Sequence, residues 1–203
     1  MADVRPYRPG DLADLYWIAD AADPDGCADA KLVGQVFAAP YAMFSPTTVF
    51  VVEDEAGIGG YIVGTPDTRA FEARLEADWW PALRAEHADP TGRPHEGWTR
   101  DDVMVWLIHH MRRAPAEAVA DYPAHLHINL LPRLQGRGIG RRLMERWLEA
   151  VRAEGAAGAH LSVGPDNVRA IAFYGRCGFR PFEVAAMKGA LWFGLKLDPQ
   201  TRR

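Results

Sequence analysis

The sequence predicts a mixed α/β fold, of the α+β kind, built on a central sheet of about seven strands. Two observations carry this prediction. After Pro123, strand-like and helix-like stretches alternate, which is typical of parallel strands joined by helices. At both ends of the chain, short apolar stretches are separated by turn residues, and this pattern predicts antiparallel hairpins that flank the parallel strands.

The N-terminal part is expected to form a strand, two helices and a hairpin. Residues 2–8 form a short strand, and 11–23 form a helix whose apolar residues recur at helical spacing. A weaker helix covers about 27–39 and stops before Pro40. The hairpin then pairs 48–53 with 59–65.

Residues 66–123 predict an ordered helical insertion between the third and fourth strands. Two or three helices surround a Pro/Gly loop at 89–97. Because a structureless loop of this length is unusual in a compact domain, we expect one domain over residues 1–203. The insertion holds four tryptophans that either form an aromatic floor for a sugar or an amine cation or, as we favour, pack in its own small core: Trp79, Trp80, Trp98 and Trp106.

The C-terminal part alternates regularly. A strand at 125–131 leads through a glycine loop, 135–140, into a helix at 141–154. A strand at 159–164 and a helix at 167–176 follow, and Gly178 ends that helix. The stretch 182–197 predicts two more strands.

The composition excludes several classes of protein. Apolar residues make up 48% and charged residues 25%, as in soluble globular proteins, and the net charge of −4 leaves no basic footprint for nucleic acid. No apolar run has the roughly 20 residues of a membrane helix, and the N-terminus lacks a secretory signal, so we expect a cytoplasmic protein without a membrane partner. Cys27 and Cys177 alone form neither a disulfide framework nor a cysteine metal site, and no metal is predicted.

The glycine loop, Gln135-Gly-Arg-Gly-Ile-Gly140, lies between a strand and a helix. Unpaired amides and the helix dipole favour an anion at such a helix start, and glycines let the ligand approach the backbone, so we expect a phosphate or pyrophosphate. A nucleotide P-loop is excluded because Arg141 and Arg142 follow the last glycine. The dinucleotide fingerprint also fits poorly, since its third glycine is replaced by Arg141.

Two motifs together resemble the GCN5-related N-acetyltransferases (GNAT). The spacing Gln135-x-x-Gly138-x-Gly140 resembles their acetyl-CoA signature, and the run from Asn167 to Phe179 resembles their second signature, in the expected order. The opening VRPYRPGDLADL is also similar to the family's usual start. The insertion, with GYIVGTPDTRAF before it and LHINLLPRLQGRG after it, looks similar to the acetyltransferase-like domain at the C-terminus of O-GlcNAcases and its free-standing bacterial relatives.

This resemblance implies that acetyl-CoA lies between two splayed parallel strands, the fourth (125–131) and the fifth (159–164). The pantetheine arm would pair with the backbone near Leu130 and Leu131. The pyrophosphate would lie on the loop amides, with Arg137, Arg141 or Arg142 at the phosphates, and the residues implied are Gln135, Gly136, Arg137, Gly138, Ile139, Gly140 and Arg141.

The resemblance also implies catalytic residues. Tyr174 matches the family's general-acid tyrosine, which protonates the departing thiolate; the alternative is a core aromatic. Asn167 either contacts the pantetheine arm or only caps the following helix.

The general base has two candidates. His125, His127 and Asn129 alternate along one strand and share one face, so His127 could take the amine proton if that face lines the acceptor cleft. A buried structural histidine is the alternative. Asp67 is the second candidate, with turn capping as its alternative role.

We therefore expect an acetyl-CoA-dependent N-acetyltransferase that transfers acetyl to a primary amine, on a small molecule or a peptide, by direct attack on the thioester. A catalytically inactive acetyl-CoA-binding module is the main alternative. A protein-lysine acetyltransferase would need an open acidic groove, whereas the insertion suggests a lid or wall. The protein is expected to be a monomer or a homodimer.

Overall fold

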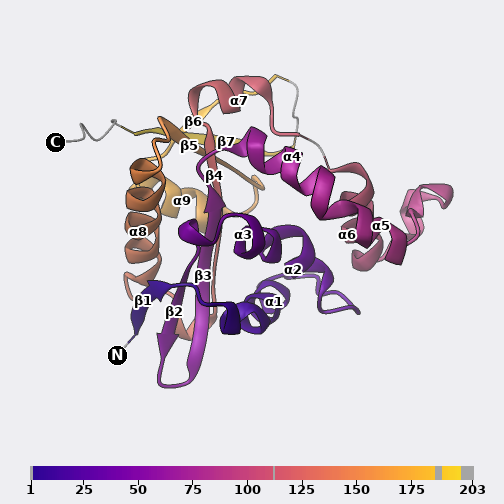
Figure 1. The fold of residues 1–203 in the computed structure, drawn as a ribbon, viewed down its shortest axis with the longest axis horizontal. Coiled ribbons are helices and arrows are strands. Elements are labelled where there is room, and N and C mark those ends of the chain that lie inside the picture. Colours follow the sequence, from indigo (N-terminus) through magenta and orange to yellow (C-terminus); the bar gives the residue numbers. More distant parts are fainter. Residues whose placement is uncertain (1, 112, 186–188, 198–203) are drawn as a thin grey trace.

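The computed structural model describes residues 2–111, 113–185 and 189–197, and its centre is one seven-stranded sheet (Figure 1). The strand order is β1-β2-β3-β4-β5-β7-β6. All neighbouring strands are antiparallel except β4 and β5, which are parallel. The strands are β1 (Asp3–Pro6), β2 (Phe50–Asp54), β3 (Gly57–Thr65), β4 (Ala124–Leu130), β5 (Gly158–Val163), β6 (Arg180–Phe182) and β7 (Leu191–Lys196). The predicted mixed sheet is confirmed.

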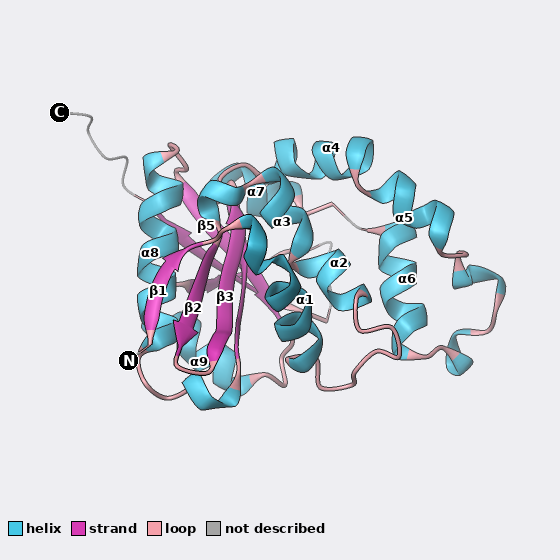
Figure 2. Cartoon of the chain, turned by 60° about the horizontal axis from the view of Figure 1, so that its bottom comes forward, coloured by secondary structure: helices cyan, strands magenta, loops and turns pink. Residues whose placement is uncertain are grey.

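Helices cover both faces of the sheet and extend past one end of it (Figure 2). Helices α1 (Leu12–Ala21), α2 (Leu32–Phe37) and α3 (Ala39–Phe44) lie on one face, and α8 (Ile139–Ala153) and α9 (Val168–Arg176) lie on the other. Each face has its own apolar cluster. Between β3 and β4 the chain forms the insertion, namely α4 (Thr68–Asp78), α5 (Trp80–Glu86), α6 (Arg100–His110) and α7 (Ala116–Asp121).

The parallel pair β4–β5 separates soon after it begins. Within the described residues, its register consists of Ala124 with Ala159 and His125 with His160. Beyond this point β5 continues to pair with β7, and β4 continues to pair with β3 as far as Leu130. The predicted splay of the fourth and fifth strands is therefore present, and it leaves an edge of β4 uncovered.

Glycine allows the closest packing at the paired end of β4. A Cβ atom on Gly64 of β3 would lie 2.3 Å from the His125 carbonyl oxygen and 2.6 Å from the Trp147 ring. Real Cβ atoms do not approach so closely, so the sheet and α8 meet here only because the side chain is absent.

Two helix predictions need correction, and proline is part of the reason. The helix expected over 27–39 is shorter, and Pro40 does not end it but occupies the first turn of α3, where its missing N–H costs nothing. The insertion holds four α-helices in its described part rather than two or three, because Pro81 similarly begins α5 directly after α4.

The insertion is tied to the segment between α1 and α2. The Asp101 carboxylate at the start of α6 accepts hydrogen bonds from the amides of Ala28 (2.8 Å) and Asp29 (3.0 Å). Arg100 beside it pairs with Asp23, whose side chain is almost completely buried. The first turn of α6 thus holds the α1–α2 segment in place.

The four insertion tryptophans divide into a packed pair and a partly exposed pair. Trp80 is buried, and the Trp79 indole donates to the Gln35 carbonyl oxygen at 3.0 Å. Trp98 and Trp106 are partly exposed. They lie at one side of α6, where histidine rings stack on them, His95 on Trp98 and His110 on Trp106.

Candidate active site

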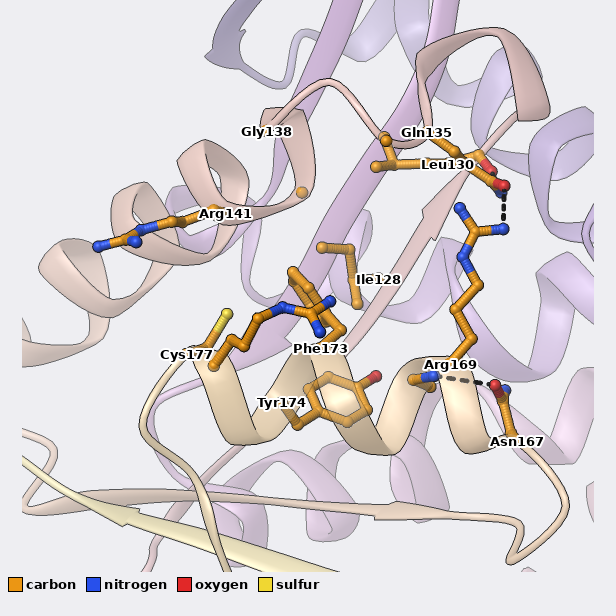
Figure 3. A pocket seen from close by; sticks show the side chains of 14 residues that line it. Ile128, Leu130, Gln135, Gly138, Arg141, Asn167, Arg169, Phe173, Tyr174 and Cys177 are labelled. Carbon is orange, nitrogen blue, oxygen red and sulfur yellow. Dashed lines mark hydrogen bonds between the residues drawn. The ribbon is translucent and has the colours of Figure 1, made fainter.

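A cavity of about 550 Å³ lies where β4 and β5 have separated, between β4, the start of α8 and the length of α9 (Figure 3). Apolar side chains form its floor and polar or charged groups its rim. The lining residues are Ile128, Leu130, Gln135, Gly136, Gly138, Gly140, Arg141, Asn167, Arg169, Ala170, Phe173, Tyr174, Arg176 and Cys177.

The glycine loop forms one end of the cavity. Gly136 (φ 73°) and Gly138 (φ 75°) adopt the left-handed conformation that other residues rarely take. Gly138 is the N-cap of α8 and, lacking a side chain, leaves the first amides of that helix uncapped. These amides and the dipole of a fifteen-residue helix favour an anion at this position.

The uncovered edge of β4 forms the second wall. The Leu131 amide donates to the Gly59 carbonyl oxygen at 2.8 Å, so Leu131 bonds toward β3, and by the antiparallel alternation Ile128 and Leu130 direct their backbone groups toward the gap. The Leu130 carbonyl oxygen accepts from the Gln135 side chain at 2.6 Å. The Gln135 side chain thus already uses this carbonyl oxygen, and an extended ligand that pairs with the edge as an added strand would rely on the Ile128 backbone groups and the Leu130 amide.

The cavity includes most, but not all, of the cofactor residues that the sequence predicts. It is lined by Leu130, Gln135, Gly136, Gly138, Gly140, Arg141, Asn167 and Tyr174. Three predicted residues do not line it. Leu131 is buried in the cluster on the opposite face. Ile139, the first residue of α8, is buried in the apolar cluster between that helix and the sheet, and exposed Arg137 donates to the Arg133 carbonyl oxygen. Strand alternation explains the correction for Leu131.

The sequence reasoning missed six lining residues: Ile128, Arg169, Ala170, Phe173, Arg176 and Cys177. Ile128 could have been found, because it lies two positions before Leu130 and so shares its face of β4. The other five lie on α9 or at its end, and periodicity alone does not show which side of that helix faces the gap.

Tyr174 extends from α9 into the cavity, and its hydroxyl has no hydrogen-bond partner among the described residues (Figure 3). Burial raises the pKa of this phenol to about 12, with a smaller contribution from Cys177, so it carries its proton at neutral pH. Asn167 is the N-cap of α9 and accepts from the Ala170 amide at 3.1 Å, while it also lies on the cavity rim. The two roles considered for Asn167 are thus compatible.

His125, at the paired end of β4, is fully engaged. The Thr68 hydroxyl donates to the Pro123 carbonyl oxygen (2.6 Å), so it must accept from His125 Nδ1–H at 2.7 Å. His125 Nε2 then accepts from the Tyr41 hydroxyl at 2.7 Å. Burial lowers the pKa of His125 well below its usual value, and the nearby His160 and His127 add to the shift. His125 is therefore a neutral structural residue.

His127 lies on the same face, just beyond the last β4–β5 pair, and it is not among the residues that line the cavity. Its ring contacts those of Phe37 and Tyr41, and part of it remains exposed. Burial of the rest, followed by the proximity of His160, lowers its pKa to about 4. The imidazole is consequently neutral at physiological pH and able to accept a proton. The third residue of this face, Asn129, donates to the Tyr61 hydroxyl at 2.8 Å.

The structure does not bring Asp67 to the cavity. Asp67 is exposed and caps α4 by accepting from the Ala70 amide at 3.0 Å. It follows Thr65, which pairs with His125, so it lies beside the beginning of β4, whereas the cavity lies at the end of β4. Asp67 instead lines a separate hollow of about 350 Å³. This placement supports the capping role of Asp67 rather than a role as general base.

Charge in the cavity comes from arginines. Arg141 pairs with Glu145 at 2.8 Å, whereas Arg169 and Arg176 have no carboxylate partner among the described residues. Within that same part of the chain, no group of three metal-binding side chains occurs, and no helix is long and apolar enough to cross a membrane.

A family comparison agrees with this geometry. The model of the acetyltransferase (GNAT) family matches residues 14–179. The chain belongs to the GNAT family, whose members use acetyl-CoA.

Within and beyond this family, the chain is similar to part of a curated protein. Protein O-GlcNAcase of Rattus norvegicus is 28% identical over 191 residues, which are 92% of this chain and 20% of that protein. The chain therefore spans about a fifth of the length of that relative, and the resemblance to O-GlcNAcases is confirmed.

Solved structures share the fold. The crystal structure of SsHAT is 38% identical with a TM-score of 0.86, over 96% of this chain and 98% of that one. The structure of yncA from Salmonella typhimurium with its cofactor acetyl-CoA is 16% identical with a TM-score of 0.54, over 98% of this chain and 96% of that one. The predicted GNAT fold is confirmed.

Proposed function

We propose that this protein is an N-acetyltransferase that binds acetyl-CoA in the β4–β5 gap and transfers the acetyl group to a primary amine. One observation carries the proposal. The uncovered β4 edge, the amides at the start of α8 and the Tyr174 hydroxyl all border a single cavity. These are a place for an extended polar chain, a place for its phosphates and a proton donor beyond them.

The residues present fit this cofactor. The diphosphate would lie on the amides of Gly136 to Gly140, where the backbone is bare and the helix dipole favours negative charge. The pantetheine amides would pair with the backbone of Ile128 and Leu130. Arg141 and Arg176 at the rim supply positive charge for the phosphates.

The reaction needs a nucleophilic amine and a proton for the leaving group. The neutral amine nitrogen attacks the thioester carbon, and the C–S bond breaks as the amide forms. Tyr174, which carries its proton at neutral pH, would protonate the departing sulfur. The amine proton would pass to neutral His127, directly or through water.

Direct attack fits the residues of the cavity better than a covalent enzyme intermediate. Cys177 is the thiol among the cavity-lining residues, and burial raises its pKa, which disfavours the thiolate that would be needed as a nucleophile.

Two measurements test this proposal. Calorimetry with the purified chain should show micromolar binding of acetyl-CoA, and free CoA should be released with at least one member of a panel of primary amines. Tyr174→Phe should retain acetyl-CoA binding while turnover falls about 100-fold, as for loss of a general acid. Absence of acetyl-CoA binding would refute the proposal.

A non-catalytic acetyl-CoA-binding module is the second candidate, and one observation favours it. Neither of the two residues considered as the base, Asp67 and His127, lines the cavity, and the pKa of His127 is lowered to about 4. Tight acetyl-CoA binding without CoA release from any amine would support the module. An identical rate for Tyr174→Phe and the unaltered protein would support it too.

A further inference from the structure

Arg169 lies where its charge is unfavourable for the helix that carries it. It is the second residue of α9, and the positive end of a helix dipole disfavours a cation in the first turn. Asn167 already satisfies the helix start by accepting from the Ala170 amide. Arg169 therefore contributes nothing evident to α9 itself, and its role lies in what its side chain contacts.

The Arg169 side chain crosses the cavity rim to the glycine loop (Figure 3). Its Nη1 atom donates to Gln135 Oε1 at 2.6 Å, and Gln135 Nε2 donates to the Leu130 carbonyl oxygen at 2.6 Å. The Arg169–Gln135–Leu130 bridge thus links α9, the loop and the uncovered edge of β4. It does so beyond the point where the β4–β5 ladder has ended.

The bridge holds the loop at a sensitive point. Gln135 immediately precedes Gly136, and both Gly136 and Gly138 have positive φ. Glycines lose the most conformational freedom on ordering, so a loop built from them binds weakly unless something else restrains it. A side chain fixed at both its oxygen and its nitrogen restrains the first residue of this loop.

We propose that Arg169 is a positioning residue that acts through Gln135 to order the anion-binding loop before the cofactor arrives. The role rests on the proposed acetyl-CoA site. It differs from a direct contact between Arg169 and a phosphate, because the guanidinium is already directed at a neutral amide of the protein.

A double-mutant cycle separates the two roles. Arg169→Met and Gln135→Met are each expected to weaken acetyl-CoA binding about fivefold, the size of one lost hydrogen bond. The double variant should also be about fivefold weaker, because both changes break one bridge. Arg176→Met is the matched control: it removes the same charge from the same cavity, and its effect should multiply with that of Gln135→Met. Arg169→Lys should recover part of the affinity.

Amide hydrogen exchange in the free protein is the second measurement. Exchange at Gly136 and Gly138 should become faster in Arg169→Met and stay unchanged in Arg176→Met, while thermal unfolding of both matches the unaltered chain. Multiplying effects in the Arg169 and Gln135 cycle, or unchanged exchange, would overturn the inference. If the unaltered chain does not bind acetyl-CoA, the proposed function fails, and the exchange experiment still decides whether the bridge orders the loop.

Discussion

The two ends of β4 differ in how their polar groups are satisfied. At the beginning, β4 is paired on both sides, and His125 has a partner on each ring nitrogen. At the end, β4 is paired only with β3, and the groups that face the gap meet the cavity. One strand thus contains a closed structural half and an open half.

This difference explains why similar residues have different roles. Desolvation raises the pKa of both the Tyr41 and the Tyr174 phenol. Tyr41 donates to His125, whereas the Tyr174 hydroxyl is directed into the cavity without a partner in the described part of the chain. A satisfied group stabilises the fold, and an unsatisfied group beside a cavity is available for chemistry.

Acid should have the largest effect, and it should act through the histidines in the closed half and just beyond it. The pKa values of His125, His127 and His160 are all lowered in the folded state, with burial as the main cause. Below pH 6.5 these histidines are protonated in the unfolded chain but remain neutral in the folded chain. The free energy of unfolding should therefore fall by about 1.4 kcal/mol for each histidine and each unit by which the pH is lowered, until the pH reaches the pKa of that histidine in the folded state.

Denaturant unfolding between pH 7.5 and pH 4.5 measures this loss. His127→Gln should reduce the steepness of the decline, since one of the three protons is no longer linked to unfolding. A stability that is constant from pH 7 to pH 5 would contradict the assignment of neutral buried histidines.

Gly64→Ala should have the next largest effect, again at the closed end. The added methyl group would overlap the His125 carbonyl oxygen and the Trp147 ring. Because a backbone oxygen cannot move as a side chain can, we expect a loss of about 3 kcal/mol. Chemical denaturation measures it, with Gly92→Ala as control, since a Cβ there meets no atom within 4 Å. Equal midpoints for both variants would disprove the close contact.

Paired tyrosine substitutions compare the two halves directly. Tyr41→Phe removes the donor to His125 Nε2 and leaves a buried acceptor unsatisfied, so the free energy of unfolding should fall by about 2 kcal/mol. Tyr174→Phe removes a hydroxyl without a partner among the described residues, and stability should change by less than about 0.5 kcal/mol. Urea unfolding measures the loss of stability in both variants. A larger loss for Tyr174→Phe than for Tyr41→Phe would contradict the distinction between the two halves of β4.

The smallest perturbation uses the two cysteines and requires no substitution. Cys177 lines the cavity, whereas Cys27 lies outside it, and both are partly exposed. Saturating acetyl-CoA should slow alkylation of Cys177 several-fold and leave that of Cys27 unchanged, as mass spectrometry of the labelled peptides would show. Equal protection of both thiols would argue against the cavity as the binding site.

The sequence predicts well what depends on local pattern. Glycines before a charged amphipathic helix and Asn167 before the next one are short-range signals, and both stand where they were expected, at a loop and at a helix start. The mixed sheet follows from the order of strands and helices. Pro40 does not mark the end of a helix, because proline is tolerated in the first turn of a helix as well as after its end.

Long-range contacts are what the sequence could not provide. Arg169 and Gln135 are separated by 34 positions, and neither residue type signals that the two meet. The placement of Asp67 depends on the β3–β4 register, which puts it beside the start of β4. The sequence predicts a cofactor contact for both Leu130 and Leu131, but only Leu130 lines the cavity, since the strand ladder decides which of two adjacent residues faces the gap.

The bonds from Asp101 to the amides of Ala28 and Asp29 limit how this fold can be re-engineered. A chimera whose new segment 66–123 has no carboxylate at the position of Asp101 would lose the acceptor for both amides unless residues 22–31 are exchanged with it. Residues 22–31 and 66–123 should therefore be exchanged together in any chimera that replaces the insertion.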